Sequence, residues 1–349
     1  MRGEGDMTTN HHRLRGRSGC SCGLHAILLL GLVGLLSACA GSYPALYTQP
    51  ELESAAAVKR LEAPSAAGEP PAAGELPAAA AARSITVATL NMLHGLPRFV
   101  HLERRKHLIL AELERLSPDV ILLQEVPVFR ARDRQIGPWL AESLGYTMAY
   151  ARANGRAAWI GFEEGEAVLS RYPIREIRRH VLLPKPGLFE NRIVLRAVLD
   201  TPLGALEVYN THFSHRVNRD PLRLKQAEAL VRFLRDSYRL RELPAVVGGD
   251  INAFPESAPM RFLREQGLVD IALAADPPAD GATSWFEDIT DPGDGPKARI
   301  DYLFLYSTGA ENPLTVRRCT RFLNRPFAVE EGFLWASDHV GLLCELAPE

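Results

Sequence analysis

From Ser84 to the C-terminus, short apolar runs alternate with longer stretches that carry apolar residues at three-to-four spacing. Such short runs are typical of buried strands, and the longer stretches are typical of helices that pack one face on a sheet. The expected strands span 85–92, 119–126, 166–172, 192–200, 206–213, 244–250, 298–306, 314–322 and 339–346; the expected helices span 99–117, 135–145, 221–238 and 257–267. Strands and helices alternate at first and strands cluster later, which predicts one layered α/β domain with mixed sheets over residues 84–349.

Residues 1–38 have the features of a secretory signal. Basic residues between 13 and 17 precede an apolar stretch at 24–36, which is too short to serve comfortably as a membrane span. The sequence LSAC at 36–39 resembles a bacterial lipobox, in which Cys39 would be lipidated and become the first mature residue. The alternative is an ordinary signal peptide with an incidental cysteine. Because several acyl chains on one cysteine hold firmly, the lipobox predicts an extracytoplasmic protein anchored in the cell envelope. Ala40 at the next position favours the outer membrane if the cell is Gram-negative.

Residues 39–83 are dominated by Ala, Pro, Gly and Glu and show no periodic apolar pattern. Such a segment cannot bury enough surface to order itself, so we expect a disordered tether. The whole chain is 46% apolar and has a formal net charge of −2. Loss of residues 1–38, which hold four arginines and two acidic residues, would leave a charge near −4. This balance argues against a strong nucleic-acid binder, although a local groove could still be basic.

Two cysteines remain in the predicted domain, because Cys20 and Cys22 would leave with the signal. Outside the cytoplasm, Cys319 and Cys344 can form a disulfide. The alternative is a pair of buried free thiols on neighbouring strands.

Polar side chains interrupt the predicted strands at or near their ends. They are Asn91, Gln124, Glu125, Asn210, Thr211, His212, Asp250, Asn252, Asp301, Ser337, Asp338 and His339. Each has an unremarkable alternative: Asn91 could cap a turn, Glu125 could be an exposed edge charge, and Asp338 could begin an Asx-turn. Together these alternatives weaken, because sites in layered α/β folds collect where strand ends converge.

The ordered motifs around these residues resemble the endonuclease/exonuclease/phosphatase superfamily, which includes deoxyribonuclease I. They read TLNM, QEV, NTHF, GDIN, RIDYLF and SDH, and they cover residues 84–347. The resemblance implies a four-layer α/β/β/α sandwich of two packed mixed sheets. It also implies a divalent-metal-dependent phosphoester hydrolase.

The resemblance assigns a role to each residue. Glu125 would bind the metal, with Asn91 and Asp338 close to it. Mg²⁺ fits oxygen ligands of this kind, with Mn²⁺ as an alternative, whereas no Cys/His cluster suits zinc. His339 would be the acid/base centre, held in one tautomer by Asp301.

The remaining roles concern the attacking water and the phosphate. Asp250 would orient or activate the water, and Asn252 would donate to a phosphoryl oxygen. His212 would contact a phosphoryl oxygen or protonate the leaving group; its alternative is a histidine tied to a backbone carbonyl. Arg192 and Lys297 could add substrate contacts by position and charge.

The sequence therefore favours an envelope-tethered phosphodiesterase, phosphatase or nuclease. Its substrate would be a phospholipid head group, a nucleic acid or a small phosphoester. No long apolar hairpin that could enter a bilayer is visible, and no protein partner can be inferred. The alternative is a non-catalytic envelope binding protein on the same fold, against which the retention of the complete set of polar residues speaks.

Overall fold

The computed structural model describes residues 58–61, 84–131, 135–187, 190–216, 218–240, 242–284, 288–291, 293, 295–309 and 313–349. All of them belong to one compact unit, Pro50–Glu349. The predicted signal, Cys39 and all of the predicted tether except 58–61 lie outside the described residues. Within the described ranges, no helix has the length and apolar character needed to cross a membrane.

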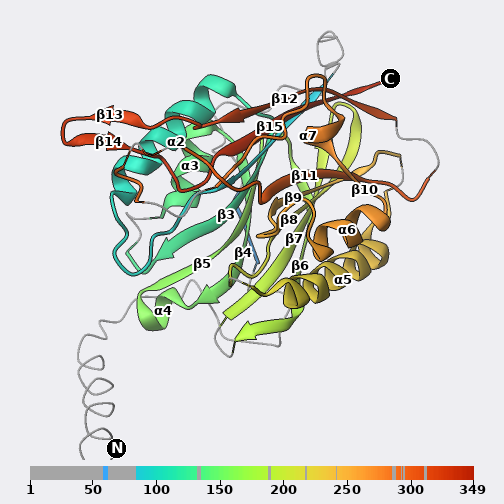
Figure 1. Ribbon diagram of the computed structural model, residues 1–349. Coiled ribbons are helices and arrows are strands. Elements are labelled where there is room, and N and C mark those ends of the chain that lie inside the picture. The colour runs from blue at the N-terminus through green and yellow to red at the C-terminus, as the bar shows by residue number, and fades with distance from the viewer. Residues whose placement is uncertain are drawn as a thin grey trace, which may run out of the picture. The chain divides into compact units, whose positions relative to one another are not determined.

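Two sheets form the centre of the unit (Figure 1). The first has the order β1-β4-β5-β3-β2-β15-β12, and the second has the order β10-β11-β9-β8-β7-β6. The strands of the first sheet are β1 (Val58–Leu61), β2 (Ile85–Asn91), β3 (Val120–Phe129), β4 (Thr147–Gly155), β5 (Phe162–Ser170), β12 (Leu314–Phe322) and β15 (Gly341–Pro348). Those of the second are β6 (Ile174–Gly187), β7 (Glu190–Thr201), β8 (Gly204–His212), β9 (Ala245–Asp250), β10 (Leu268–Asp270) and β11 (Asp301–Tyr306). A small separate hairpin consists of β13 (Phe327–Val329) and β14 (Gly332–Leu334).

Helices cover the outer face of each sheet (Figure 1). The first sheet carries α2 (Leu102–Leu116) and α3 (Ile136–Leu144), and the second carries α5 (Asp220–Ser237) and α6 (Ala258–Glu265). Two single turns, α4 (Ala157–Ile160) and α7 (Ile271–Ala274), complete the set among the described residues. The predicted four-layer α/β/β/α sandwich is therefore confirmed.

The central strands are buried on both faces, which explains their continuous apolar runs. Because side chains alternate along a strand, Val120 and Leu122 of β3 face the layer between the sheets. Ile121 and Leu123 point the other way, into the core under α2 and α3. The apolar layer between the sheets holds them face to face.

Several elements were not predicted. β4 is rich in small residues, and β6 exposes charged side chains along one face, so neither reads as a buried run. β1 lies within the segment predicted as a tether and pairs antiparallel with β4. At the other side of the same sheet, Cys319 and Cys344 lie opposite each other on β12 and β15 and form a disulfide.

Candidate active site

The polar residues converge at one edge of the two sheets, where the parallel pairs β2–β3 and β8–β9 both end. Strand register alone brings three of them together. Asp250, the last residue of β9, lies opposite His212 on β8 and Asp301 on β11. The three positions are thus fixed side by side by backbone pairing.

The glycine before Asp250 is required by this packing. Gly249 has φ of +135°, and a Cβ at that position would lie 1.9 Å from the carbonyl oxygen of Thr211. Only glycine lets β9 approach β8 this closely. After Asp250 the chain turns, because the backbone N–H of Asn252 donates to Asp250 Oδ1 at 2.9 Å. Asn252 itself has φ of +52°, a conformation that asparagine tolerates better than most residues.

A bulge in β3 directs Glu125 into the site. The register between β3 and β5 shifts between Leu123 and Val126, and Glu125 has φ of +56°. Bulges of this kind re-aim a side chain at the end of a strand. The Glu125 carboxylate accepts hydrogen bonds from Asn91 Nδ2 and from the backbone N–H of His94, both at 3.1 Å.

Asn91 connects the two sheets across the site. Its Nδ2 also donates to Asp250 Oδ2 at 3.1 Å, while its Oδ1 accepts from the backbone N–H of Leu93. The Asn91 amide therefore lies between the carboxylates of Glu125 and Asp250 and donates a hydrogen bond to one oxygen of each.

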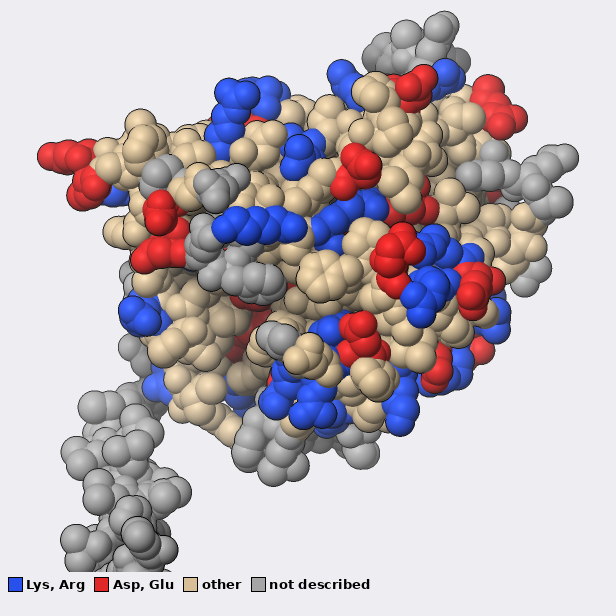
Figure 2. Space-filling view, in the orientation of Figure 1, with Lys and Arg blue, Asp and Glu red and all other residues tan. Residues whose placement is uncertain are grey.

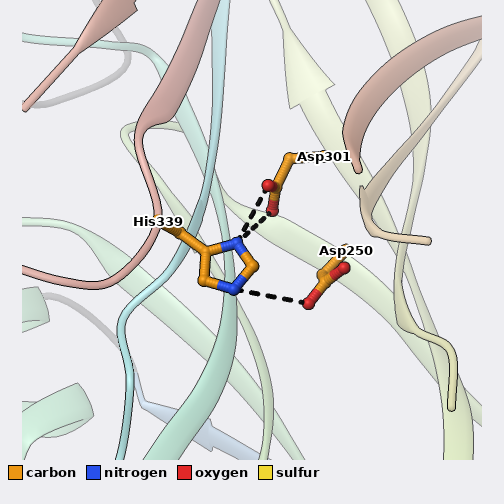
Figure 3. A group of neighbouring side chains, drawn as sticks. All are labelled: Asp250, Asp301 and His339. Atoms are coloured by element: carbon orange, nitrogen blue, oxygen red, sulfur yellow. Dashed lines mark hydrogen bonds and ion pairs between the residues drawn. The ribbon is translucent and has the colours of Figure 1, made fainter. Parts of the chain in front are cut away.

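His339 lies between two buried aspartates (Figure 3). Its Nδ1 is 2.9 Å from Asp301 Oδ2 and 3.1 Å from Oδ1, and its Nε2 is 3.8 Å from Asp250 Oδ2. Thr283 Oγ1 donates to Asp301 Oδ2 at 2.6 Å and fixes that carboxylate. The expected contact between Asp301 and His339 is present, and the other ring nitrogen, Nε2, faces Asp250 and lies 3.4 Å from Ser284 Oγ.

The charges of Asp301, His339 and Asp250 shift one another's pKa values. Burial would lower the pKa of His339, but Asp301 first and Asp250 second raise it well above its ordinary value. Burial and the charge of Asp301 raise the pKa of Asp250 to about 7. At neutral pH the site thus holds an imidazolium, His339, beside a carboxyl group, Asp250, that is ready to take or lose a proton.

The pKa of Glu125 moves the other way. Its burial favours the neutral acid, but nearby His94, the hydrogen bond from Asn91 and the charge of His339 outweigh burial and lower the pKa of Glu125. For Asp338, burial raises the pKa, with His339 opposing it. Glu125 therefore remains an anion in the site.

The loop that carries Asp338 and His339 is fastened to the end of β2. Ser337 Oγ donates to the carbonyl of Asn91 at 2.7 Å and accepts from the backbone N–H of His339 at 3.1 Å. Fully buried Arg105 on α2 reinforces this link, because Nη1 donates to the carbonyls of both Met92 and Ala336. The sequence did not single out Arg105, since a basic residue in a helix usually faces solvent.

His212 is buried and has no hydrogen-bond partner at either ring nitrogen among the described residues. Its Nε2 lies 3.4 Å from Asp250 Oδ2, and no backbone carbonyl holds it. Burial and the charge of Arg192 lower the pKa of His212 well below the ordinary value. It is therefore a neutral imidazole in the site. Asn252, in contrast, donates its Nδ2 to the carbonyl of Phe213 at 3.2 Å.

Sequence analysis missed three buried acids on β5, Glu163, Glu164 and Glu166, of which the last two have carboxylate oxygens without a partner. Glu166 has no hydrogen-bond partner at either oxygen, and Glu164 has none at Oε2. Burial raises the pKa of both, and for Glu166 the charge of Glu164 adds to it. Alternating polar residues at the start of a strand, as in EEGEAV, are the signal that could have found them. Arg192, also buried, donates to Glu190 at 3.2 Å and lies 2.8 Å from His215, whereas Lys297 is exposed.

The donor set fits a hard divalent cation. Glu125 stays ionised, and Asp338 adds a carboxylate that is only partly buried. Asn91 holds Glu125 in place through its Nδ2, while its Oδ1 accepts from Leu93. Mg²⁺ and Mn²⁺ prefer such oxygen donors. A second acidic group, Asp250, Asp301 and His339, has ligand atoms within 4.8 Å of one another. Its members are already joined to one another by a hydrogen bond and ion pairs, so Glu125 remains the better-suited ligand.

A protein-family model of the endonuclease/exonuclease/phosphatase family matches residues 88–339. The chain belongs to this family. Members act on phosphoester bonds as nucleases or phosphatases, and divalent metals are common among them.

Relatives among characterised proteins are distant. The chain is 26% identical to exodeoxyribonuclease III of Haemophilus influenzae over 248 residues, which are 62% of this chain and 88% of that one. It is 32% identical to protein angel homolog 2 of Danio rerio over 173 residues, 46% of this chain but 29% of the relative. It is 26% identical to carbon catabolite repressor protein 4 homolog 5 of Arabidopsis thaliana, covering 51% of this chain and 41% of the relative. The match thus spans less than half the length of these last two.

Solved structures share the fold. A family protein from Bacteroides thetaiotaomicron superposes with a TM-score of 0.60 at 20% identity, over 76% of this chain and 98% of the other. The human Nocturnin catalytic domain with bound sulfate has a TM-score of 0.58 at 22% identity, over 76% and 94%.

Proposed function

We propose that this protein is a divalent-metal-dependent phosphoester hydrolase whose catalytic line is Asp301–His339–Asp250. The observation that best supports this is the buried imidazole of His339, which lies 2.9 Å from the carboxylate of Asp301. It faces Asp250, whose pKa is raised to about 7. A carboxyl group with a pKa near the working pH is well suited to take a proton from water. A protein with no chemistry to perform gains nothing from burying three coupled ionisable groups.

Each residue of the chain has a distinct task in this proposal. Asp250 orients the attacking water and accepts its proton. His339, kept protonated by Asp301, donates hydrogen bonds to the phosphoryl oxygens, where negative charge develops in the transition state. His212 donates a hydrogen bond from its neutral ring to a phosphoryl oxygen. Asn252 turns its amide from the carbonyl of Phe213 toward the phosphate when substrate binds.

Glu125, with Asn91 and Asp338, would hold Mg²⁺ or Mn²⁺. Such an ion, when bound, withdraws charge from the phosphoryl oxygens. The chain's own contribution is to keep Glu125 ionised through His94 and Asn91 and to hold the loop of Asp338 in place through Arg105 and Ser337.

We also propose that the enzyme works in the cell envelope, anchored through lipidated Cys39, with substrates drawn from phospholipid head groups, nucleic acid and small phosphoesters. The lipobox-like LSAC sequence supports the anchor. The disulfide between Cys319 and Cys344 supports an oxidising compartment, because structural disulfides are rare in the cytosol.

The test of the catalytic line uses the compact unit 50–349 and a soluble diester, bis-p-nitrophenyl phosphate. Asp250→Asn should lower kcat by about 10²–10⁴-fold, the usual contribution of a positioned acid or base. The matched control is Asp200→Asn, a surface carboxylate paired with Arg175, which should keep full activity. Normal turnover by Asp250→Asn would refute the role. Absence of turnover in the wild type would favour the non-catalytic binding protein.

A further inference from the structure

Large apolar side chains are exposed mainly at the edge that holds the candidate site. Nine are exposed among the described residues, and six of them lie in or beside the turns at this edge. They are Leu96, Val100, Trp159, Ile160, Leu183 and Phe254. These loops follow β2 and β9 or connect β4 to β5 and β6 to β7, and all of these turns lie where Asn91 and Asp250 lie. Contiguous exposed apolar surface on a soluble domain commonly marks a contact with a membrane or a partner.

Three of these side chains stand on two neighbouring turns. Trp159 and Ile160, in α4, are 67% and 71% exposed, and Leu183, at the end of β6, is 57% exposed. The two turns are joined at their base, because the Asn154 side chain exchanges hydrogen bonds with the backbone of Asn191, the closer at 2.6 Å, and Asn191 Nδ2 donates to the carbonyl of Ala153. We call segments 154–162 and 183–187 the twin turns.

The twin turns carry positive charge and no acidic residue. They hold Arg156, whose guanidinium stacks over Trp159 at 4.3 Å, and exposed Lys185. Exposed Arg130 lies beside them and donates to the carbonyls of Ala158 and Trp159. Figure 2 shows Lys and Arg side chains gathered at the lower edge of this face, over the ends of β6 and β7. This local surplus contrasts with the formal net charge of −2 for the whole chain.

The chain enters the domain from the same edge. β1 runs antiparallel to β4, with Val58 opposite Ala151 and Leu61 opposite Met148. β4 ends at Gly155, where the first of the twin turns begins. The N-terminal end of β1 therefore points toward the twin turns, so an anchor that precedes β1 would hold this edge toward the membrane.

We infer that the twin turns form a docking surface for an anionic phospholipid bilayer. Trp and aliphatic side chains flanked by Arg and Lys are the combination that favours the interface between head groups and acyl chains. Bases of a nucleic acid stack on flat rings, and Ile160 and Leu183 offer none. The inference rests on the proposed function for the identity of the reaction and deepens it. It means that the phosphoester is cleaved at the surface of a membrane, beside the twin turns.

The test compares vesicle binding by variants of unit 50–349, which has no lipid of its own. Wild type should sediment with vesicles of phosphatidylglycerol and phosphatidylcholine in equal amounts and much less with phosphatidylcholine alone. The double variant Trp159→Ser, Ile160→Ser should bind the mixed vesicles at least about tenfold more weakly, because each side chain loses its transfer into the interface. The matched control is Val269→Ser with Leu273→Ser, two exposed apolar residues away from this edge, which should bind as wild type does.

Equal vesicle binding by both double variants, or no binding by the wild type, overturns the inference. A third result would also overturn it: the wild type binds a single-stranded oligonucleotide but no vesicles, and the Trp159 variant loses the oligonucleotide. That result would identify a base-stacking surface. Turnover of bis-p-nitrophenyl phosphate is measured in parallel and should be unchanged in the Trp159 variant. That soluble assay separates failure of the docking surface from failure of the catalytic proposal.

Discussion

Replacement of Asp301 by Asn should shift the whole pH–rate profile toward acid. The negative charge of Asp301 raises the pKa of Asp250 and, as the largest favourable influence, that of His339. Asn keeps the size of the side chain and one acceptor oxygen for His339 Nδ1 or Thr283 Oγ1. With the charge gone, both pKa values fall. The acid limb, where Asp250 loses its proton, and the alkaline limb, where His339 loses its own, then both move to lower pH.

The size of the shift follows from the geometry. The nearest ligand atoms of Asp250 and Asp301 lie within 4.8 Å of each other. Two unit charges at this separation interact by about 3.5 kcal/mol at an effective dielectric constant of about 20. Because about 1.4 kcal/mol corresponds to one pH unit, the acid limb should start near pH 7 in the wild type and fall by about 2 units or more in Asp301→Asn.

The assay is kcat/KM for bis-p-nitrophenyl phosphate from pH 5 to 10 at one saturating Mg²⁺ concentration, which reports the free enzyme. The rate at the optimum should also drop, by about 10²–10⁴-fold, because His339 loses its fixed orientation. A urea titration confirms that the variant is folded. Limbs that stay in place while the rate falls would show that Asp301 is only structural, and limbs that move to higher pH would refute the electrostatic reasoning.

Three further predictions concern the framework. Glu207→Gln should destabilise the fold by about 3 kcal/mol in urea unfolding, because the buried guanidinium of Arg196 loses the buried carboxylate at 2.6 Å and keeps only the exposed carboxylate of Glu176. The pKa of Glu207 is lowered in the folded state, since burial is outweighed by hydrogen bonds from Arg196 and two backbone N–H groups. The stabilisation by Glu207 in the wild type is therefore fully present above about pH 4.3, and it is lost as the pH falls through the lower pKa of the folded state. A difference in unfolding free energy between the two proteins that does not change with pH would contradict this. Arg105→Met should cost about 3 kcal/mol or more and lower kcat, since carbonyls of both site loops lose their donor; an unchanged unfolding midpoint would count against it. Cys319→Ser should cost about 2–4 kcal/mol yet leave kcat/KM near the wild-type value, because the disulfide lies between β12 and β15, away from the site; loss of activity in the folded variant would be unexpected.

Much of the fold could be predicted because the central strands are buried on both faces and read as unbroken apolar runs. β9 is an example, with AVVGG buried throughout. Strands at the margins of the sheets could not be predicted in this way. β6 exposes alternate charged residues, and the pairing of β1 depends on contacts with β4, which is distant in sequence.

The candidate site could be predicted where polar residues interrupt strand ends, as Asp250 and Asp301 do. Partners that act through long-range contacts could not. Arg105 lies in a helix and is identified only by the carbonyls it reaches. The twin turns could not be predicted for the same reason, because the link between them is the hydrogen bonds between Asn154 and Asn191, which are distant in sequence.

The most direct test of the account is metal-dependent turnover by unit 50–349 and its Glu125→Gln variant. The panel would hold bis-p-nitrophenyl phosphate, plasmid DNA, a phosphatidylinositol phosphate, sphingomyelin and a nucleoside monophosphate, each with Mg²⁺, Mn²⁺ or EDTA. The account predicts turnover of at least one class with metal, none with EDTA, and a loss of about 10²-fold or more in Glu125→Gln that higher metal concentration partly restores. Turnover that persists in EDTA, or metal binding without turnover of any phosphoester, would contradict it.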